Sequence, residues 1–223
     1  MSVLELKDIS KIIENKVETL NILEKINLKI DKGNIVSIYG RSGVGKTTLL
    51  SIIGTLQKPS SGNMYFNNSK IDFSSDLYLF RRRNVGFVFQ DSHLLPEFSI
   101  LENLIIPQLI NNEKYLKAKE KSEELLSLIN LSNLSDRYPY QISGGEKQRV
   151  SLLRGIVNNP DLIIADEPSA NLDEKNCELL MELIVKLNSD LNGTFIIATH
   201  DKRFEDISNN IYSLFNGELI SNE

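Results

Sequence analysis

The chain has 223 residues, of which 41% are hydrophobic and 25% are charged, values that are ordinary for a globular protein with one sizeable core. Its formal net charge is −5, whereas a surface that binds duplex nucleic acid needs an excess of basic residues, so we do not expect nucleic acid as a partner. The one cysteine, Cys177, excludes disulfides and cysteine metal clusters within the chain, and its place in a helical apolar pattern predicts that it is buried.

The first 34 residues predict a small β-sheet. Apolar residues cluster in residues 3–6 and alternate with polar ones in residues 20–30, before a turn at residues 31–34. Acidic residues stand in residues 1–8 where a signal peptide needs an apolar core, and no apolar run approaches the roughly 18 residues of a membrane span. We therefore expect no direct insertion into a membrane, and any work on a membrane to pass through another protein.

A phosphate-binding loop is predicted between the apolar run of residues 35–39 and the amphipathic run of residues 49–56. The loop consists of Gly40, Arg41, Ser42, Gly43, Val44, Gly45, Lys46, Thr47 and Thr48. Its glycines permit backbone conformations closed to other residues, so successive N–H groups can form an anion-sized cradle at a helix N-terminus. We expect Lys46 to reach the β- and γ-phosphates of a nucleoside triphosphate and the Thr47 hydroxyl to hold Mg²⁺. The alternative, a glycine-rich turn with an incidental lysine, does not account for the flanking strand and helix.

The rest of the chain alternates strands and helices. Short apolar runs predict strands at residues 85–89, 162–165 and 195–199, and residues 211–220 predict a terminal hairpin. Residues 91–141 instead show a helical pattern among many lysines and glutamates. The chain is therefore predicted to be an α/β protein with a mostly parallel sheet and an inserted helical lobe.

Polar side chains follow three of these strands, at the carboxyl ends where α/β folds place ligand groups. We expect Asp166 to bind Mg²⁺ through its water shell and Glu167 to orient and polarise the attacking water. Gln90 is expected to meet Mg²⁺ or that water and to link the nucleotide state to the position of the lobe. His200 would hydrogen-bond the γ-phosphate. The alternatives are a solvated acidic turn, a surface glutamine and a structural histidine.

A second glycine-containing helix start lies in residues 142–150. Ser143 is the expected N-cap, and Glu146 completes a capping box across Gly144 and Gly145. Two glycines behind a serine also leave a positively polarised cluster of amides that suits an anion. The alternative is simply a well-capped helix. One phosphate loop is sufficient to bind one triphosphate, so this second anion site has no evident function within a single chain.

The order of these motifs resembles the nucleotide-binding subunits of ABC transporters over essentially the whole chain. It comprises the loop at residues 40–48, Gln90, residues 142–150, residues 162–173 and His200. The resemblance implies a single ABC ATPase domain, with ATP and Mg²⁺ as cofactors. A P-loop NTPase (RecA-like) core with a small antiparallel β subdomain would occupy residues 1–90 and 160–223. Residues 91–159 would form the helical subdomain, which includes the second glycine-containing helix start.

The resemblance also implies a homodimer that forms when ATP binds. Residues 143–146 of one subunit would contact the γ-phosphate of the ATP held by the loop of the other, and residues 169–173 would cross the interface. Glu167 would be the general base and His200 the sensor of the γ-phosphate. Hydrolysis would release the dimer and pass a stroke through the helical subdomain to integral membrane subunits, with the chain peripheral on the cytoplasmic face of the inner membrane.

Several segments look most like the lipoprotein-releasing (LolD-type) ATPases. They are residues 54–59, the arginines at 81–83, residues 93–98, residues 101–104 and Pro107. The implied task is to power the release of lipoproteins from the inner membrane. Because macrolide-exporter and cell-division relatives are similar, the alternative is a nucleotide-gated regulatory ATPase of the FtsE-like or MacB-like kind. A soluble ABC ATPase acting on DNA or ribosomes is disfavoured, because this acidic chain has neither long coiled coils nor a second cassette.

Two positions depart from the family pattern. Relatives usually carry an aromatic residue that stacks on adenine shortly after the first strand, and Ile13 stands at the matching place here. An aliphatic side chain still covers the base but forfeits a stacking contribution of roughly 0.5–1.5 kcal/mol, which predicts weaker ATP binding and relaxed base choice. Arg41 stands where many relatives carry proline, and we expect it to face solvent and change little.

Overall fold

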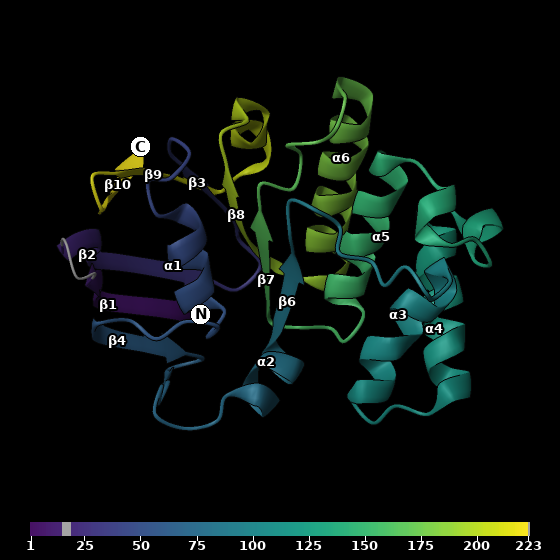
Figure 1. The fold of residues 1–223 in the computed structure, drawn as a ribbon, viewed down its shortest axis with the longest axis horizontal. Helices are drawn as coiled ribbons and strands as arrows, with labels where there is room; N and C mark the ends of the chain where they lie inside the picture. The colour runs from purple at the N-terminus through teal and green to yellow at the C-terminus, as the bar shows by residue number, and fades with distance from the viewer. Residues whose placement is uncertain (15–18, 223) are drawn as a thin grey trace.

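The computed structural model describes residues 1–14 and 19–222, which are arranged around two β-sheets (Figure 1). The larger sheet has six strands in the order β10-β9-β3-β8-β7-β6, and all of them except β10 run parallel. They are β3 (Ile35–Tyr39), β6 (Val85–Val88), β7 (Leu162–Asp166), β8 (Thr194–Thr199), β9 (Asn210–Phe215) and β10 (Glu218–Asn222). The predicted α/β architecture with a mostly parallel sheet is confirmed.

The register of the parallel strands determines where the site can form. Tyr39 of β3 lies opposite Thr199 of β8, and Asp166 of β7 lies opposite Ala198. These three strands therefore end at the same edge of the sheet. Because parallel strands share one direction, the segments that follow them meet at this carboxyl edge.

A smaller antiparallel sheet flanks the first one, with the strand order β2-β1-β4-β5. Its strands are β1 (Ser2–Glu14), β2 (Thr19–Asp31), β4 (Ser61–Phe66) and β5 (Ser69–Lys70). Helix α1 (Lys46–Ile53) lies between the two sheets (Figure 1). Leu49 and Ile52 of α1 are fully buried in one apolar cluster with Leu6 and Ile26 of the small sheet and Ile196 of the large one. This packing fixes the helix that begins at the phosphate loop.

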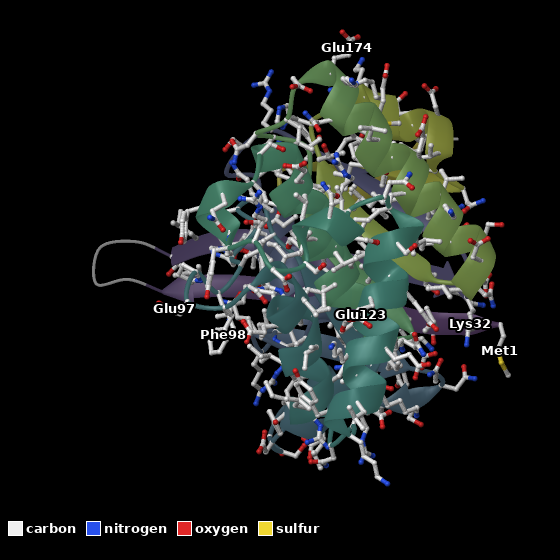
Figure 2. All side chains as sticks on the ribbon, turned by 90° about the vertical axis from the view of Figure 1, so that its right-hand side faces the viewer. Met1, Lys32, Glu97, Phe98, Glu123 and Glu174 are labelled. Carbon is white, nitrogen blue, oxygen red and sulfur yellow. The ribbon has the colours of Figure 1, made fainter. Side chains whose placement is uncertain are left out.

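Helices α5 (Gly144–Ile156) and α6 (Glu174–Leu191) cover the opposite face of the large sheet, and α3 (Ile100–Ile110) and α4 (Tyr115–Leu128) lie beyond α5 on the same side (Figure 1). Helix α3 packs on α5, and α4 packs on α3. Leu153 of α5 and Leu180 of α6 share a second buried cluster with Ile163 and Ile197 of the sheet. Figure 2 looks onto this helical side, with Glu123 of α4 toward the viewer. The short helices are α2 (Tyr78–Asn84), η1 (Ser132–Leu134), η2 (Pro139–Gln141) and η3 (Lys202–Ile207).

Some local boundaries differ from the sequence-based expectations. The helix expected at residues 49–56 spans Lys46–Ile53, because the N–H groups at the end of the phosphate loop begin it directly. The helical pattern also starts later than predicted, since residues 91–99 form a loop ahead of α3. Strands β4 and β5 and helix α2 were not predicted, and α2 has no buried residue to leave an apolar periodicity. Cys177 is fully buried, as predicted.

Among the described residues, no helix combines the length and the apolar character that crossing a bilayer requires.

Candidate nucleotide-binding site

The phosphate loop connects β3 to α1 and places two glycines in left-handed conformations. Gly43 and Gly45 have φ angles of +79° and +112°, a region that other residues rarely adopt. Gly45 is the N-cap of α1 and has no side-chain capping bond, so the first N–H groups of the helix stay available to an anion. Ser42 and Thr47 are exposed on the loop, as is Arg41, whose solvent-facing position was expected. The backbone N–H groups at the end of the loop are therefore available to donate hydrogen bonds to a phosphate group.

Lys46 is held between the loop backbone and Glu167. Its Nζ donates to the carbonyl oxygens of Gly40 at 2.7 Å and Arg41 at 3.3 Å. The same Nζ lies 3.1 Å from Glu167 Oε1, and only 6% of the lysine side chain is exposed. A buried ammonium needs such partners, because burial without them would remove its hydration without compensation.

Asp166 and Thr47 offer oxygen atoms that fit Mg²⁺. The Thr47 hydroxyl donates to Asp166 Oδ2 at 2.7 Å, whereas Asp166 Oδ1 is buried without a hydrogen-bond partner. Burial raises the pKa of Asp166, against the opposing effect of the Thr47 hydrogen bond, and a divalent cation would favour the charged form. Residues 1–14 and 19–222 contain no cluster of three or more histidine, cysteine or acidic side chains placed to hold a metal. A Mg²⁺ bound by one carboxylate, one hydroxyl and phosphate oxygens needs no such cluster.

Glu167 joins the residues that follow β7 and β8. Its backbone is left-handed, with φ of +47°, and its N–H donates to the Ala198 carbonyl at 2.8 Å. Oε2 lies 2.8 Å from His200 Nδ1 and accepts from the His200 backbone N–H at 3.2 Å. The structure therefore brings Lys46, Glu167 and His200 together at the carboxyl edge. A carboxylate in this setting can accept a proton, and the largely exposed imidazole beside it can reach a ligand.

Gln90 follows β6 beside the strand that ends in Asp166, since Val88 of β6 lies opposite Ala165 of β7. It is exposed and lines a pocket of about 130 Å³ with Gly144, Pro168 and Asn171. In the described part of the chain, Thr47 donates to Asp166, and no hydrogen bond joins Gln90 to either residue. Its expected contact with Mg²⁺ or the attacking water therefore stays a prediction, whereas its place beside the start of α5 connects it to the second anion site.

The second glycine-containing helix start has the predicted capping box. Ser143 Oγ accepts from the Glu146 N–H at 3.3 Å, and Glu146 Oε2 accepts from the Ser143 N–H at 2.8 Å and from its hydroxyl at 2.7 Å. These hydrogen bonds from Ser143 lower the pKa of Glu146. Gly144 is exposed, with open space where a side chain would stand, but a Cβ on Gly145 would collide with the Asn176 amide.

The two glycine-rich helix starts lie on opposite faces of the large sheet. Helix α1 packs with Leu162 and Ile164 of β7, whereas α5 packs with Ile163 and Ala165 of the same strand (Figure 1). Because consecutive strand residues point to opposite faces, the helices are separated by the sheet itself. A single chain therefore does not present both anion sites to the same phosphate.

Ile13 lies near the end of β1, where it pairs with Leu20 of β2. Its side chain is 37% exposed, and Leu20 is also exposed. Ile13 and Leu20 therefore offer an exposed aliphatic surface near the end of β1. The expected contact of Ile13 with adenine stays a prediction.

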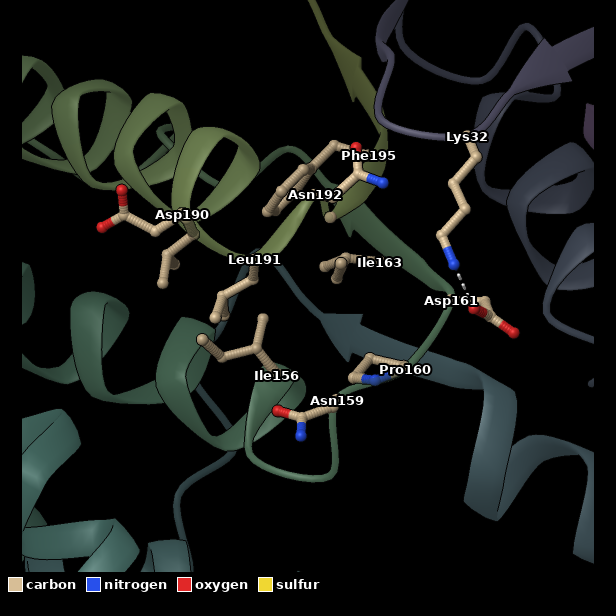
Figure 3. Close-up of a pocket in the computed structure, with 12 residues that line it drawn as sticks. Lys32, Ile156, Asn159, Pro160, Asp161, Ile163, Asp190, Leu191, Asn192 and Phe195 are labelled. Carbon is tan, nitrogen blue, oxygen red and sulfur yellow. Dashed lines mark hydrogen bonds and ion pairs between the residues drawn. The ribbon is translucent and has the colours of Figure 1, made fainter. Parts of the chain in front are cut away.

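A pocket of about 450 Å³ lies at the opposite edge of the large sheet, near the amino ends of β7 and β8 (Figure 3). Ile163 and Phe195 form part of its wall, and Lys32 lies 3.3 Å from Asp161 at its rim. None of the predicted site residues lines it. The chemistry of the carboxyl edge therefore does not extend to this pocket.

An apolar groove of about 460 Å³ lies between α2, β6 and α3. Its walls include Phe87, Phe89 and Pro107, and its basic residues are Arg81, Arg82 and Arg154. Arg82 Nε is buried and finds no hydrogen-bond partner in the described residues. From sequence the arginine run was part of the family resemblance and was otherwise expected to be a solvated or carboxylate-paired surface. Instead, Arg81 Nη1 and Arg82 Nη1 donate to the carbonyl oxygens of Thr55 and Ile110. Helix α2 itself was not predicted.

Two further residues, which were not predicted from the sequence, contact the site loops. Asp201 follows His200 and accepts a hydrogen bond from Ser169 Oγ at 3.2 Å. Asn176 stands against Gly145 and accepts from Arg149 Nη1 at 3.1 Å. The position of Asp201 directly after the predicted His200 was the one sequence signal for it. No sequence signal pointed to Asn176.

Comparisons with known proteins agree with this geometry. The ABC transporter family model matches residues 23–170. A protein of Buchnera aphidicola from Schizaphis graminum named lipoprotein-releasing system ATP-binding protein LolD is 42% identical, over 99% of this chain and 97% of its own length. A protein of Bacteroides thetaiotaomicron with the same name is 42% identical, over 90% and 93%. A solved ATP-binding cassette, dimeric in a post-hydrolysis state with ADP and phosphate, superposes with a TM-score of 0.88 at 36% identity, covering 97% of this chain and 96% of that one.

Proposed function

Because this chain belongs to the ABC transporter family of ATP-binding, ATP-hydrolysing subunits, we propose that it powers the release of lipoproteins from the inner membrane. The observation that carries the proposal is the full-length similarity to proteins named as lipoprotein-releasing system ATP-binding proteins, at 42% identity over 99% of the chain. In this proposal the chain works at the cytoplasmic face of the membrane, bound to integral membrane subunits.

The proposed ATP site is the carboxyl edge of the large sheet. The amides of residues 40–48 would bind the β- and γ-phosphates, with Lys46 donating to them. Thr47 and Asp166 would hold Mg²⁺, with Gln90 reaching it as the lobe moves. When bound, the cation neutralises charge that develops on the phosphate oxygens. The buried, unpartnered Asp166 Oδ1 supports this assignment.

The proton transfer would fall to Glu167. The oxygens of a triphosphate attract the Lys46 ammonium more strongly than one carboxylate does. Nucleotide binding would therefore move this ammonium away from Glu167 Oε1. Glu167 would then orient water and accept its proton, while His200 contacts the γ-phosphate. The existing contact between Glu167 and His200, at 2.8 Å, supports their joint action.

The complete site would require a second copy of the chain. Ser143, Gly144, Gly145 and Glu146 start a helix on the sheet face opposite to α1, so they would serve the γ-phosphate held by a partner subunit. The dimeric state of the solved cassette described above supports a head-to-tail dimer around two ATP molecules. ATP would then hold the dimer together, and hydrolysis would release it.

The groove between α2, β6 and α3 is the proposed contact with the membrane subunits. Its apolar walls suit a short amphipathic helix, and its three arginines suit acidic residues on that helix. The unpartnered Arg82 Nε supports a partner that carries a hydrogen-bond acceptor. Movement of α3 relative to the sheet would transmit the nucleotide state to this partner.

The test is ATP hydrolysis by the chain reconstituted with its membrane subunits in lipid vesicles. If the proposal is correct, adding an acylated lipoprotein stimulates phosphate release and moves the lipoprotein off the vesicles, and Glu167→Gln abolishes both effects. A nucleotide-gated regulator, the alternative, predicts ATP-dependent binding to the membrane subunits without lipoprotein-stimulated turnover. That second result would overturn the proposed cargo while leaving the ATPase assignment intact.

A further inference from the structure

The carboxylate of Asp201 joins three segments at the carboxyl edge of the large sheet. Its Oδ2 accepts hydrogen bonds from Ser169 Oγ at 3.2 Å and from Cys177 Sγ at 3.4 Å. Arg203 Nη2 donates to the same oxygen at 2.7 Å, and Arg203 Nε donates to Oδ1 at 2.9 Å. Ser169 and Cys177 are 5% and 0% exposed, so this carboxylate lies over buried donors.

These contacts exceed what the cap of a short helix requires. Asp201 is the N-cap of η3, and Oδ1 accepts from the Arg203 backbone N–H at 3.1 Å. One oxygen suffices for that role. Oδ2 instead meets donors from the segment after β7 and from the first turn of α6. The Arg203 guanidinium, as the largest effect, holds the pKa of Asp201 at about 2, so the carboxylate is charged at physiological pH.

The hydrogen bonds close a ring around the proposed general base. Glu167 Oε2 is bound to His200, Asp201 follows His200 in the chain, and Asp201 Oδ2 is bound to Ser169. Ser169 in turn lies two residues after Glu167. The ring thus fixes both the backbone that carries Glu167 and the backbone that carries His200.

We propose that Asp201 is a positioning residue for ATP hydrolysis, which holds residues 167–169 and His200 in one arrangement. The inference rests on the proposed roles of Glu167 and His200. ATP capture depends on the separate loop that follows β3, so loss of the Asp201 connection misplaces the base without removing the phosphate cradle. Small misplacements of a catalytic group lower the rate of the chemical step more than they weaken binding.

The experiment measures steady-state ATP hydrolysis by the full chain carrying Asp201→Asn, Ser169→Ala or both. The amide keeps the size of the carboxylate but loses its charge and turns one acceptor into a donor facing donors. We expect Asp201→Asn to lower kcat at least about tenfold while the KM for ATP changes less than about twofold. Ser169→Ala should lower kcat less, and the double variant should match Asp201→Asn, because both changes break the same connection.

The matched control is Asp206→Asn, an exposed aspartate of the same short helix, whose kcat should stay within about twofold of the original chain. ATP-binding stoichiometry gives the folded fraction, so kcat is expressed per binding-competent subunit even if a variant is less stable. Three results would overturn the proposal: a kcat for Asp201→Asn within twofold of the original, a rise in KM as large as the fall in kcat, or a fall in kcat of the double variant that equals the product of the two single falls. Glu167→Gln tests the general base separately, so failure of that role is distinguishable from failure of this one.

Discussion

The ammonium of Lys46 lies 3.1 Å from Oε1 of Glu167, and both side chains are largely buried. The cation proposed to bind phosphate and the carboxylate proposed to accept a proton are therefore partners of one another in this structure. Lys46 also donates to two carbonyl groups of its own loop, so it can shift from Glu167 to a phosphate without losing every partner. We infer that phosphate binding and release of the base are one coupled event.

Glu167→Gln tests the role of the base. The glutamine keeps the shape of the side chain but cannot accept a proton, so we expect kcat for ATP hydrolysis to fall at least about a hundredfold. ATP-dependent dimerisation should persist, because the residues that bind the phosphates are unchanged. Phosphate release and light scattering measure the two properties.

The control for this prediction is Lys46→Ala, which should weaken ATP binding itself and therefore prevent dimerisation as well as hydrolysis. Calorimetric titration with ATP separates the two variants. Turnover near the original rate in the Glu167→Gln chain would remove Glu167 from its proposed role. A Glu167→Gln chain that stays monomeric at saturating ATP and Mg²⁺ would instead argue against the sandwiched dimer.

The sequence was sufficient to predict the phosphate loop and the polar residues after β7 and β8, because apolar runs mark where strands end and glycine spacing marks the loop. The contact between Lys46 and Glu167 was not predictable in the same way. It depends on β3 and β7 ending at one edge with β8 between them, which is a property of strand order. Asp201 and Asn176 were missed because each acts through contacts with residues distant in sequence. Helix α2 was missed because none of its residues is fully buried: Phe80 alone packs against Phe66 of the core, which leaves no apolar period.

Gly145→Ala tests how closely the start of α5 packs against α6. A Cβ on Gly145 would collide with the Asn176 side chain, whose Nδ2 is held by Asp173 at 2.9 Å and whose Oδ1 is held by Arg149 at 3.1 Å. Because Asn176 cannot move away freely, we expect the free energy of unfolding to fall by about 1–3 kcal/mol. Urea denaturation measures it.

Gly144→Ala is the matched control for stability, since nothing lies within 4 Å of a Cβ placed there. An alanine in the first turn of a helix should leave the free energy of unfolding unchanged or raise it by up to about 1 kcal/mol. Asn176→Ala removes Oδ1 and Cγ, the two nearest atoms, and leaves only Cβ at 2.9 Å, so Gly145→Ala should cost less in that background than in the original chain. Equal costs in both backgrounds would show that the Asn176 contact does not explain the need for glycine.

Ile13→Tyr tests the proposed adenine contact. If Ile13 covers the base, an aromatic ring adds a stacking contribution and should tighten ATP binding by up to about tenfold, with stronger discrimination against pyrimidine nucleotides. Titration with ATP and with UTP measures both effects. Ile12→Tyr is the control, because consecutive residues of a strand point to opposite faces. Equal ATP affinities for Ile13→Tyr and the original chain would refute the contact.

The ion pair between Asp201 and Arg203 predicts a pH dependence of stability. The pKa of Asp201 is lowered from 3.8 to about 2 in the folded chain, chiefly by the hydrogen bonds from Arg203. Because the unfolded chain then binds this proton more readily, the carboxylate stabilises the fold above the unfolded pKa and loses that effect as the pH falls from about 4 toward 2. The difference in free energy of unfolding between the original chain and Asp201→Asn should therefore be constant from pH 7 to roughly pH 5 and shrink below pH 4. Urea denaturation across this range measures the difference. In an Arg203→Met background the decline should be smaller and end at higher pH, because the largest cause of the lowered pKa is gone and the folded pKa moves back toward the unfolded one. A difference that stays constant down to pH 3 in both backgrounds would show that the ion pair does not lower the pKa of Asp201 in solution.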